Sequence, residues 1–289
     1  ATLRLDTEGG ITLAVGTAPQ GQGHETIFKQ LVCESLGVMP DKVMIVTGDT
    51  TMTEVGGGTF NSRSAICGGA VVERVKRKLI ERCYGLAAVH FEAAVTDLEF
   101  STGQFHIVGT DRRISLMDIA KSEGGMEETA EFSTEAPTFP QGCHVCEVEI
   151  DPETGDVSIE RYVTVDDVGN ILNPSILEGQ IHGGVAQGIG QALLEEIRYD
   201  PISGQILNGS FMDYAMPRAD NFCNITSGSH PIPTDVNPLG VKGAGEAGTV
   251  GALPAVMCAV ADALADVGGS DINMPAAPER IWQALRTSI

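Results

Sequence analysis

The sequence predicts an α+β fold in which mixed sheets and hairpins pack against long helices. Short segments that alternate apolar and polar residues, as strands do, lie between longer segments with apolar residues at helical spacing. The two kinds of segment follow no regular strand–helix–strand order, which argues against a doubly wound parallel sheet. All 289 residues are predicted to form one domain, with a possible internal boundary at 124–141.

In the first half of the chain, the patterns predict hairpins at 3–17 and 96–108, helices at 24–36, 64–84 and 115–122, and a buried strand at 43–47. The basic residues from 74 to 82 are expected to form a solvated helix face. The acidic stretch 123–135 is interpreted as a solvated loop, within a polar segment that extends to Pro140.

In the second half, the patterns predict strands at 143–150 and 156–165 and helices at 174–196 and 249–265. Both helices are rich in apolar residues, so we expect them to be buried, the first packed through its glycines. The turn sequences at 151–155 and 200–204 are typical of hairpins and lack the acid spacing of a calcium loop.

Composition excludes several classes of protein. The net charge of −21 argues against a nucleic-acid surface, because affinity for phosphate polymers depends on Lys and Arg, of which only 18 are present. The seven cysteines include one C-x-x-C pair, Cys143 and Cys146, without a second pair to complete a zinc site. We therefore expect reduced, buried or structural thiols in a cytoplasmic protein. The longest apolar stretch, 250–261, contains Pro254 and is too short for a membrane span.

Residues 243–248 match G-x-G-x-x-G, the phosphate-binding fingerprint of dinucleotide folds. That fingerprint requires a hydrophobic strand immediately before it. Here Pro231, Pro233 and Pro238 precede the glycines and exclude a central strand. A nicotinamide-binding function is therefore the less favoured interpretation.

Glu246 is the one carboxylate among these glycines, at the expected start of an apolar helix. Desolvation in a crowded apolar site favours the protonated form of a carboxylate, whereas a helix N-terminus favours the charged form. The balance suits a general base near neutral pH. The alternative is that Glu246 only caps the helix.

Two glycine-containing loops are candidates for contacts with a phosphate or a pterin. Residues 21–26 lie between a strand and a helix and offer free backbone N–H groups and the Gln22 amide. The alternative is an ordinary strand-to-helix turn that binds nothing. Residues 56–64 place two hydroxyls and Arg63 at a helix start, where an anion would bind. The alternative there is a surface loop in which Arg63 pairs with a carboxylate.

Three further polar residues have weaker signals. Gln180 lies near a helix start and either reaches a ligand or faces solvent. His24 and His182 have no partner at metal-ligand spacing and are interpreted as structural.

Together these segments resemble the second molybdenum-cofactor-binding domain of the xanthine dehydrogenase, aldehyde oxidase and carbon monoxide dehydrogenase family, which has the xanthine oxidase-like fold. The matching blocks, in the family's order, are GQGHET at 21–26, GGGTFNSRS at 56–64, GQIHGGVAQGIGQALLEE within 171–196, DYAMPRA at 213–219, NPLGVKGAGEAG at 237–248 and MPAAPERIW ending at Trp282. The resemblance covers essentially all of this chain and about the last two-fifths of a typical large subunit.

The resemblance implies that Glu246 is the catalytic base, which deprotonates a molybdenum-bound hydroxyl so that its oxygen enters an electrophilic substrate carbon. The implied cofactor is molybdenum-molybdopterin, in bacterial members usually as the cytosine dinucleotide, with no metal ligand directly from a protein side chain. The implied cofactor contacts are Gln22, Gly23, Thr59, Phe60, Ser62, Arg63, Ser64, Gln180, Lys242, Gly243 and Gly245.

The resemblance also implies partners, because nothing here matches the family's N-terminal GGxFG block or its substrate-selecting residues. We expect either a naturally split large subunit or an excised fragment, with the N-terminal molybdenum-domain half, a 2Fe–2S protein and an FAD protein as partner chains or domains. The implied function is part of a molybdenum hydroxylase of the xanthine, aldehyde or N-heterocycle dehydrogenase type. The alternative is a non-catalytic cofactor-binding or assembly module, which would have little reason to keep a carboxylate at Glu246.

Overall fold

The computed structural model describes residues 1–134, 136–267 and 271–287. Contacts divide the chain into two compact units. Unit 1 comprises Ala1–Thr138 with Pro233–Gly243, and unit 2 comprises Phe139–Ile232 with Ala244–Ile289. The first crossing, after Thr138, falls inside the stretch 124–141 in which the sequence analysis places a possible boundary. The return of 233–243 to unit 1 was not foreseen, because so short a segment has no compositional sign of the core that it joins.

Unit 1 is built on a four-stranded sheet in the order β3-β2-β1-β7. Its strands are β1 (Thr2–Leu5), β2 (Ile11–Val15), β3 (Val43–Thr47) and β7 (Met126–Thr129). β1 and β2 form the predicted antiparallel hairpin, and β3 runs parallel to β2. A parallel neighbour requires a crossover, which is provided by α1 (His24–Leu36) with the predicted bounds. Gly23 and Gly37 flank α1 with φ of 78° and 63°, a left-handed conformation that favours glycine.

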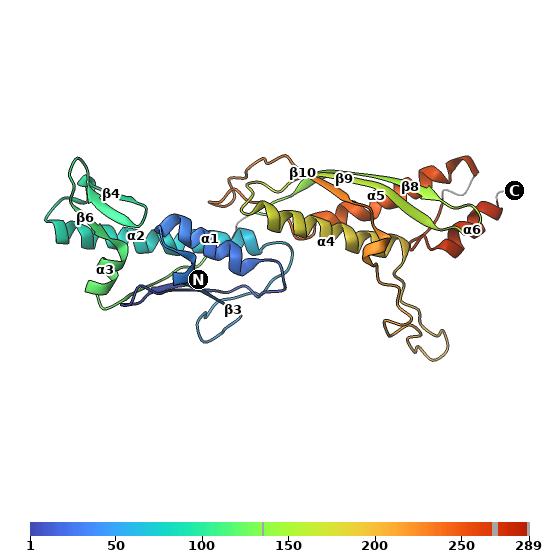
Figure 1. The fold of residues 1–289 in the computed structure, drawn as a ribbon. Helices are drawn as coiled ribbons and strands as arrows, with labels where there is room; N and C mark the ends of the chain where they lie inside the picture. Colours follow the sequence, from blue (N-terminus) through green and yellow to red (C-terminus); the bar gives the residue numbers. More distant parts are fainter. Residues whose placement is uncertain (135, 268–270, 288–289) are drawn as a thin grey trace. The chain divides into compact units, whose positions relative to one another are not determined.

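Helices α1 and α2 (Gly69–Phe91) lie along one face of this sheet (Figure 1). α2 continues a π-helical turn, η2 (Ser64–Gly68), so the helix predicted from residue 64 is confirmed and extends to Phe91. The strands contribute alternate apolar side chains to this core: Leu3, Leu5, Ile11 and Leu13 are all buried. In this layer of helices on a sheet, the glycine-containing loop at 21–26 follows the C-terminal end of β2, and the loop at 56–64 precedes η2 and α2.

Lys76 contradicts the solvated helix face expected for residues 74–82. Its side chain is buried, and its ammonium group donates to Leu31 O at 2.7 Å, to Ser35 Oγ and to Glu73 Oε1. Burial lowers the pKa of Lys76, and the hydrogen bond to Glu73 opposes that shift. Two of the three acceptors belong to α1, and a spacing pattern within one helix cannot show such distant partners.

The acidic stretch 123–135 is also not simply a loop, because it contains β7. β7 pairs antiparallel with β1, and Met126 is buried between the acidic residues. Glu127 binds Arg4 at 2.5 Å and Glu128 binds Arg82 at 3.1 Å. One buried side chain is too weak a pattern to predict a strand, so the sequence analysis misses it.

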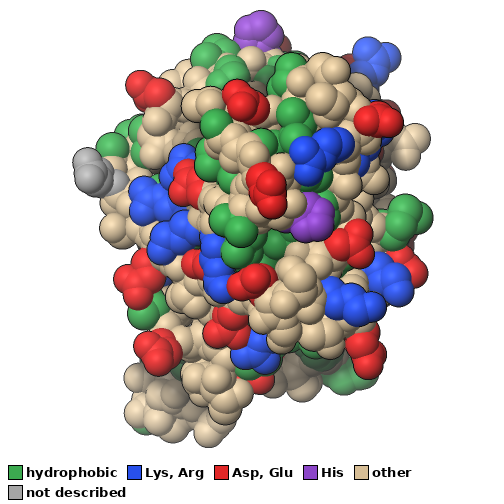
Figure 2. Space-filling view, turned by 90° about the vertical axis from the view of Figure 1, so that its left-hand side faces the viewer, with side chains coloured by type: hydrophobic (Ala, Val, Ile, Leu, Met, Phe, Trp, Pro, Cys, Tyr) green, Lys and Arg blue, Asp and Glu red, His purple; other side chains and the backbone are tan. Residues whose placement is uncertain are grey.

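The other end of unit 1 carries a small antiparallel sheet of β4 (Leu98–Ser101), β5 (Gln104–Ile107) and β6 (Arg113–Ser115), followed by α3 (Leu116–Ser122). The hairpin and the helix are as predicted, and β6 was missed. Ser115 caps α3 by accepting a hydrogen bond from Asp118 N at 3.0 Å. On this end, acidic and basic side chains are interspersed (Figure 2).

Unit 2 is a three-stranded sheet, β10-β9-β8, with helices packed on it (Figure 1). Its elements are β8 (Gln141–Ile150), β9 (Val157–Asp167), α4 (Pro174–Leu193), β10 (Ile225–Ser229), α5 (Ala247–Ala263) and α6 (Pro278–Thr287). The core joins β9, α4, α5 and α6 through the buried residues Tyr162, Val185, Val256 and Ile281. β10 and α6 were not predicted from the sequence, and the helix predicted at 174–196 ends three residues earlier, at Leu193. Short 3-10 turns occupy Pro40–Lys42, Val95–Asp97, Ala219–Asn221 and Ala265–Val267.

Within the described ranges, no helix combines the length and the apolar character needed to cross a membrane.

Helices α4 and α5 approach each other through glycines, with backbone against backbone. A Cβ atom added to Gly248 would lie 2.4 Å from Ile181 O, and one added to Gly184 would lie 2.9 Å from Thr249 N. The Thr249 hydroxyl donates to Gly184 O at 3.0 Å across the same contact. The contact leaves no space for a side chain, so it fixes where α5 begins.

We predict that Gly184→Ala lowers the free energy of unfolding of unit 2 by about 1–3 kcal/mol, because the added methyl group overpacks the contact between α4 and α5. The matched control is Gly183→Ala in the same turn of α4. A Cβ at Gly183 meets nothing within 4 Å, so this change should be neutral or stabilising by about 0.5–1 kcal/mol. The fluorescence of Trp282, the single tryptophan, reports unit 2 in a urea titration. Equal effects of the two changes would contradict the glycine contact.

Candidate cofactor-binding site

The glycine-rich loop of unit 1 lies directly against the end of β2. Gly57 N donates to Gly16 O at 3.1 Å, and a Cβ added to Gly16 would lie 2.3 Å from Val55 O. Only glycine permits this distance between two backbones. The loop is therefore held in place by main-chain contacts and leaves its other polar groups available at the start of η2.

Hydroxyl groups tie the loop to residue 18, just beyond β2. Thr59 Oγ1 donates to Ala18 O at 2.6 Å and lies 3.1 Å from Ser64 Oγ. A hydroxyl rotates about its C–O bond, so the Ser64 proton can point to Thr59 Oγ1 or to an anion beside the loop. Of the residues predicted to bind the cofactor, Thr59 and Ser64 are thus in direct contact.

The segment between these hydroxyls has a constrained backbone. Asn61 and Ser62 have φ of 52° and 51°, in the left-handed region, which costs a non-glycine residue about 1–3 kcal/mol. The Arg63 guanidinium stacks on the Phe60 ring, 3.8 Å from its centroid. Since the first N–H groups of a helix have no intrahelical partner, the start of η2 presents N–H groups, a cation and hydroxyls together. This arrangement suits a phosphate, and no carboxylate pair of Arg63 is found among the described ion pairs.

The loop 237–243 reaches the same segment. A Cβ added to Gly243 would lie 2.8 Å from Ser62 Cβ and 2.9 Å from Ser62 O. The Asn237 side chain holds this loop by donating to Val241 O at 2.8 Å and accepting from Val241 N at 3.2 Å. Lys242, predicted to bind the cofactor, is half-buried beside Gly243.

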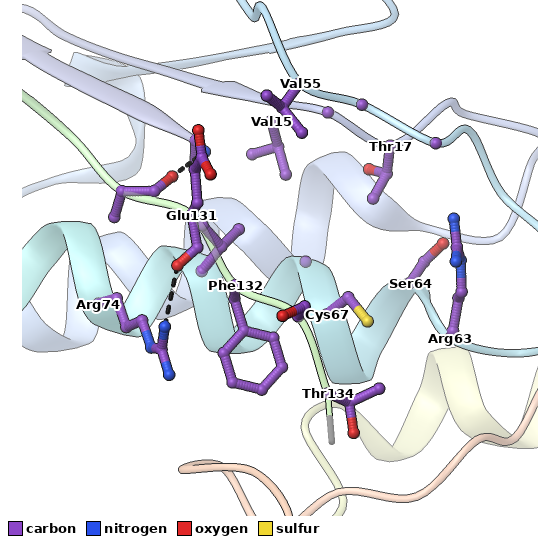
Figure 3. Close-up of a pocket in the computed structure, with 18 of the residues that line it drawn as sticks. Val15, Thr17, Val55, Arg63, Ser64, Cys67, Arg74, Glu131, Phe132 and Thr134 are labelled. Atoms are coloured by element: carbon purple, nitrogen blue, oxygen red, sulfur yellow. Dashed lines mark hydrogen bonds between the residues drawn. The ribbon is translucent and has the colours of Figure 1, made fainter. Parts of the chain in front are cut away.

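A cavity of about 670 Å³ opens beside the glycine-rich loop (Figure 3). Arg63 and Ser64 lie at one end of it, and Arg74 and Phe132 at the other. The Arg74 guanidinium stacks over the Phe132 ring, 4.6 Å from its centroid, and donates to Glu131 O at 3.0 Å. Arg74 and Phe132 were not predicted to line a site, because they lie in a basic and an acidic stretch that were expected to be solvated.

Thr17 lines this cavity and has an unsatisfied hydroxyl. The side chain is buried, and Thr17 Oγ1 has no hydrogen-bond partner among the described residues. A buried hydroxyl without a partner costs about 1–3 kcal/mol, so such groups are rare in folded proteins. Ser64 and Arg63, which line the same cavity, suit a polar, anionic group. No sequence motif marks Thr17.

Gln22 and Gly23 precede α1 in the other predicted loop. Gln22 Oε1 accepts from Gln20 N at 2.5 Å, and its amide nitrogen donates to Ala18 O at 3.3 Å. Gln22 and Thr59 therefore both bind residue 18, which brings the two loops together. His24 is buried against Phe28, and its Nδ1 has no partner in the described part of the chain. The His24 ring therefore packs in the core with one ring nitrogen left without a partner.

Gln180 and His182 lie near the start of α4 in unit 2. Asn173 caps this helix by accepting from Ile176 N at 3.1 Å, with Pro174 at its first position. Gln180 is half-buried rather than fully solvated. His182 Nε2, like His24 Nδ1, is buried without a hydrogen-bond partner in the described ranges.

Glu246 occupies the N-cap position of α5, but its side chain makes no capping hydrogen bond. The capping interpretation is therefore wrong. Glu246 and the neighbouring Gly245 are exposed, so the crowded apolar site expected around Glu246 is not formed by this chain. The last strand before Gly243 is β10, which ends at Ser229, so the strand that a dinucleotide fingerprint requires is absent from the described residues.

A buried polar cluster supports the first turns of α5. His144 Nδ1 lies 2.7 Å from Tyr162 Oη, and His144 Nε2 lies 3.2 Å from Asp166 Oδ1. A Cβ added to Gly251 of α5 would lie 2.4 Å from the His144 ring. Burial raises the pKa of Tyr162, so its hydroxyl stays protonated. The sequence analysis did not find this cluster, whose members are brought together by the pairing of β8 with β9.

The cysteines agree only in part with the expectation of reduced, buried or structural thiols. All seven are free, and burial raises the pKa of Cys146 to about 12, so it is an inert thiol. Cys143, the other member of the C-x-x-C pair, is exposed. Side chains along β8 point alternately to the two faces of the sheet, and Cys143 lies on the exposed face.

Residues 1–222 match the model of the molybdopterin cofactor-binding domain family. The chain belongs to this family. It is 35% identical to the nicotine 6-hydroxylase large subunit of Paenarthrobacter nicotinovorans, over 99% of this chain and 36% of that one. It is 32% identical to the carbon monoxide dehydrogenase large chain of Hydrogenophaga pseudoflava, over 98% of this chain and 36% of that one.

Solved structures give the same result. Reconstituted CO dehydrogenase from Oligotropha carboxidovorans superposes with a TM-score of 0.94 at 32% identity, over 99% of this chain and 37% of that chain. Quinoline 2-oxidoreductase from Pseudomonas putida 86 superposes with a TM-score of 0.91 at 34% identity, over 99% and 38%. The α+β fold and the family resemblance are thereby confirmed. The chain spans little more than a third of the length of these relatives.

We predict that Thr17→Val leaves the free energy of unfolding of the chain unchanged or raises it, because the substitution removes a hydroxyl that has no partner. The matched control is Thr164→Val, which removes a fully buried hydroxyl that donates to Asp166 Oδ2. The control should lose about 1–3 kcal/mol. Differential scanning calorimetry of the two variants checks the difference. A comparable loss in Thr17→Val would show that the fold itself satisfies Thr17.

Proposed function

We propose that this chain supplies the catalytic base and part of the cofactor site of a molybdenum hydroxylase. The hydroxylase is of the xanthine, aldehyde or N-heterocycle dehydrogenase type. The observation that carries the proposal is the position of Glu246: the α4–α5 glycine contact fixes it at the start of α5, where its side chain is exposed.

The residues of unit 1 suit the phosphate-containing end of a molybdopterin dinucleotide, for which we propose the cytosine form. Ser62 and Ser64 supply hydroxyls, Arg63 a fixed cation, and the start of η2 its free N–H groups. Thr59 and Phe60 hold the Ser64 hydroxyl and the Arg63 guanidinium in place. Gly243 allows the loop carrying Lys242 to approach this segment.

Gln22 is predicted to contact the pterin itself, and Gly23, Gln180 and Gly245 are predicted to contact the cofactor. Amide side chains donate and accept together, which matches the edge of a pterin ring. No group of three His, Cys, Asp or Glu side chains at metal-binding distances occurs in the described ranges. As the family resemblance implies, the pterin is proposed to hold the metal. When bound, the cofactor supplies the two-electron redox chemistry of the hydroxylation.

Glu246 then acts as a proton acceptor. Its carboxylate takes the proton from the water-derived oxygen that enters the electrophilic substrate carbon, which makes that oxygen a better nucleophile. Its exposure in this chain implies that another part of the enzyme covers it and excludes water. The α4–α5 contact and the His144 cluster keep α5, and hence Glu246, in a constant position.

The proposed partners are the remaining part of the large subunit and 2Fe–2S and FAD proteins or domains that carry the electrons away. One relative, 35% identical, is a subunit of the 6-hydroxypseudooxynicotine dehydrogenase complex of Paenarthrobacter nicotinovorans. The free cysteines support a reducing compartment, and we propose the cytoplasm.

The first test is the content of the assembly isolated from the source cell through a tag on this chain. We expect molybdenum, and CMP released by mild acid, in amounts stoichiometric with the chain and accompanied by the remaining large-subunit sequence. The chain expressed alone should bind little or no molybdenum, because it holds only part of the predicted contacts. Stoichiometric metal in the isolated chain, or an assembly without pterin, would contradict the proposal.

The second test separates catalysis from cofactor binding. Glu246→Gln in the assembly should lower kcat by about 10²–10⁴-fold and leave the molybdenum content unchanged, because the amide keeps the size of the side chain and cannot accept the proton. Asp262→Asn is the matched control, an exposed carboxylate at the other end of α5, and should keep full activity. Equal activity of both variants would favour the non-catalytic module.

A further inference from the structure

Unit 2 carries an extended arm, residues 197–217, between α4 and β10. The arm leaves the body of unit 2 beyond the C-terminal end of α4 (Figure 1). It contains no helix or strand and only one isolated bridge, Tyr199 with Ile206. Nothing in the proposed catalysis uses it.

The arm exposes an unusual number of large apolar side chains. Ile202 is 95% exposed, Met212 92% and Phe211 80%. Tyr199, Leu207 and Met216 are also exposed. Leaving such a side chain in water rather than burying it forgoes about 1.5–3 kcal/mol. Several of them on one segment outside the core are typical of an interaction surface.

The arm nevertheless has a defined conformation. In its tip, Asp200 Oδ1 accepts from Ile202 N at 3.1 Å and from Ser203 N at 2.7 Å. At its base, Tyr214 Oη donates to Glu195 Oε2 at 2.5 Å, and Arg198 N donates to Asn208 Oδ1 at 2.9 Å. The apolar side chains are thus presented by a hydrogen-bonded scaffold, which reduces the ordering entropy lost on binding.

We infer that the arm docks on the part of the large subunit that the relatives possess and this chain does not span. This inference rests on the proposed function. The chain aligns over 98–99% of its own length, arm included, with relatives of which it makes up only 36–38%. Those relatives therefore have most of their large chain available to cover an arm of this kind.

Charge argues for this occupant over a second copy of the chain. Two copies would each bring a net charge of −21, and like charges oppose their association. The arm itself contains one basic residue, Arg198, and two acidic ones, Asp200 and Asp213, so its own net charge is +1 − 2 = −1. A nearly uncharged, apolar contact is typical of permanent interfaces, which resemble a domain core cut in half.

The test places the photo-crosslinker p-benzoylphenylalanine at Phe211 in the assembly from the source cell. We expect the crosslinked peptide, identified by mass spectrometry, to lie in large-subunit sequence outside these 289 residues. Mass spectrometry identifies the crosslinked peptide whether that sequence lies on the same polypeptide or on another. Crosslinks only to a second copy of this chain, to the iron–sulfur or flavin protein, or to nothing would overturn the inference.

A pair of variants tests the energetic role of the arm. Phe211→Asp with Met212→Asp should leave the melting temperature of the isolated chain unchanged, because both side chains are exposed. In the assembly, the same change should lower crosslinking from an Ile202 probe to the large-subunit remainder at least tenfold. Val89→Asp is the matched control, an apolar residue of α2 that is 79% exposed, and should leave that crosslinking intact.

The outcomes of this test and of the proposed function are distinguishable. The molybdenum and CMP content of the unmodified assembly tests the proposed function. The identity of the peptide crosslinked to position 211 tests the proposed docking. A pterin-containing assembly whose arm crosslinks elsewhere would retain the function and reject the docking. An assembly without pterin would reject the function even where the arm crosslinks as expected.

Discussion

The backbone contact between α4 and α5 determines the position of Glu246, the proposed catalytic base. Gly184 and Gly248 lie where a Cβ atom would meet the opposite main chain, and the Thr249 hydroxyl bridges the two helices. Each glycine within a helix costs about 0.5–1 kcal/mol relative to alanine. α5 in turn rests on His144 of β8, so a continuous series of contacts connects the sheet to Glu246. A carboxylate on a loop would have no such support.

Unit 1 uses the same device to shape a loop. The glycine-rich segment is held against Gly16 by main-chain contact, and Gly243 approaches Ser62 where no side chain would fit. The hydroxyls of Thr59 and Ser64 are joined to Ala18, so the donors at the start of η2 are ordered before a ligand arrives. Preorganisation of this kind lets a modest number of polar groups bind an anion tightly. The strain at Asn61 and Ser62 is consistent with a site rather than a simple turn.

Elements determined by residues within their own segment are predictable from the sequence. Elements and contacts that depend on residues distant in the sequence are not. The bounds of α1 are predicted to the residue because its apolar residues follow helical spacing and Gly37 and Pro40 stop the helix. β7 is missed because only Met126 marks it as a strand, and its evidence lies in the pairing with β1. Lys76 is misplaced because its acceptors on α1 are distant in sequence. In the site, Arg63 and Glu246 follow from motif and glycine context, whereas the unsatisfied Thr17 hydroxyl exists only once the fold surrounds it.

Four buried polar atoms have no partner among the described residues: Thr17 Oγ1, His24 Nδ1, Thr138 Oγ1 and His182 Nε2. Two of them, in His24 and His182, lie within the family-like blocks. The most exposed apolar side chains lie on the arm. Folded proteins rarely leave either kind of group uncompensated, yet the core of each unit is well packed. The exposed apolar side chains of the arm therefore belong to a surface that another part of the enzyme covers, and the inferred cover is the remaining large-subunit surface.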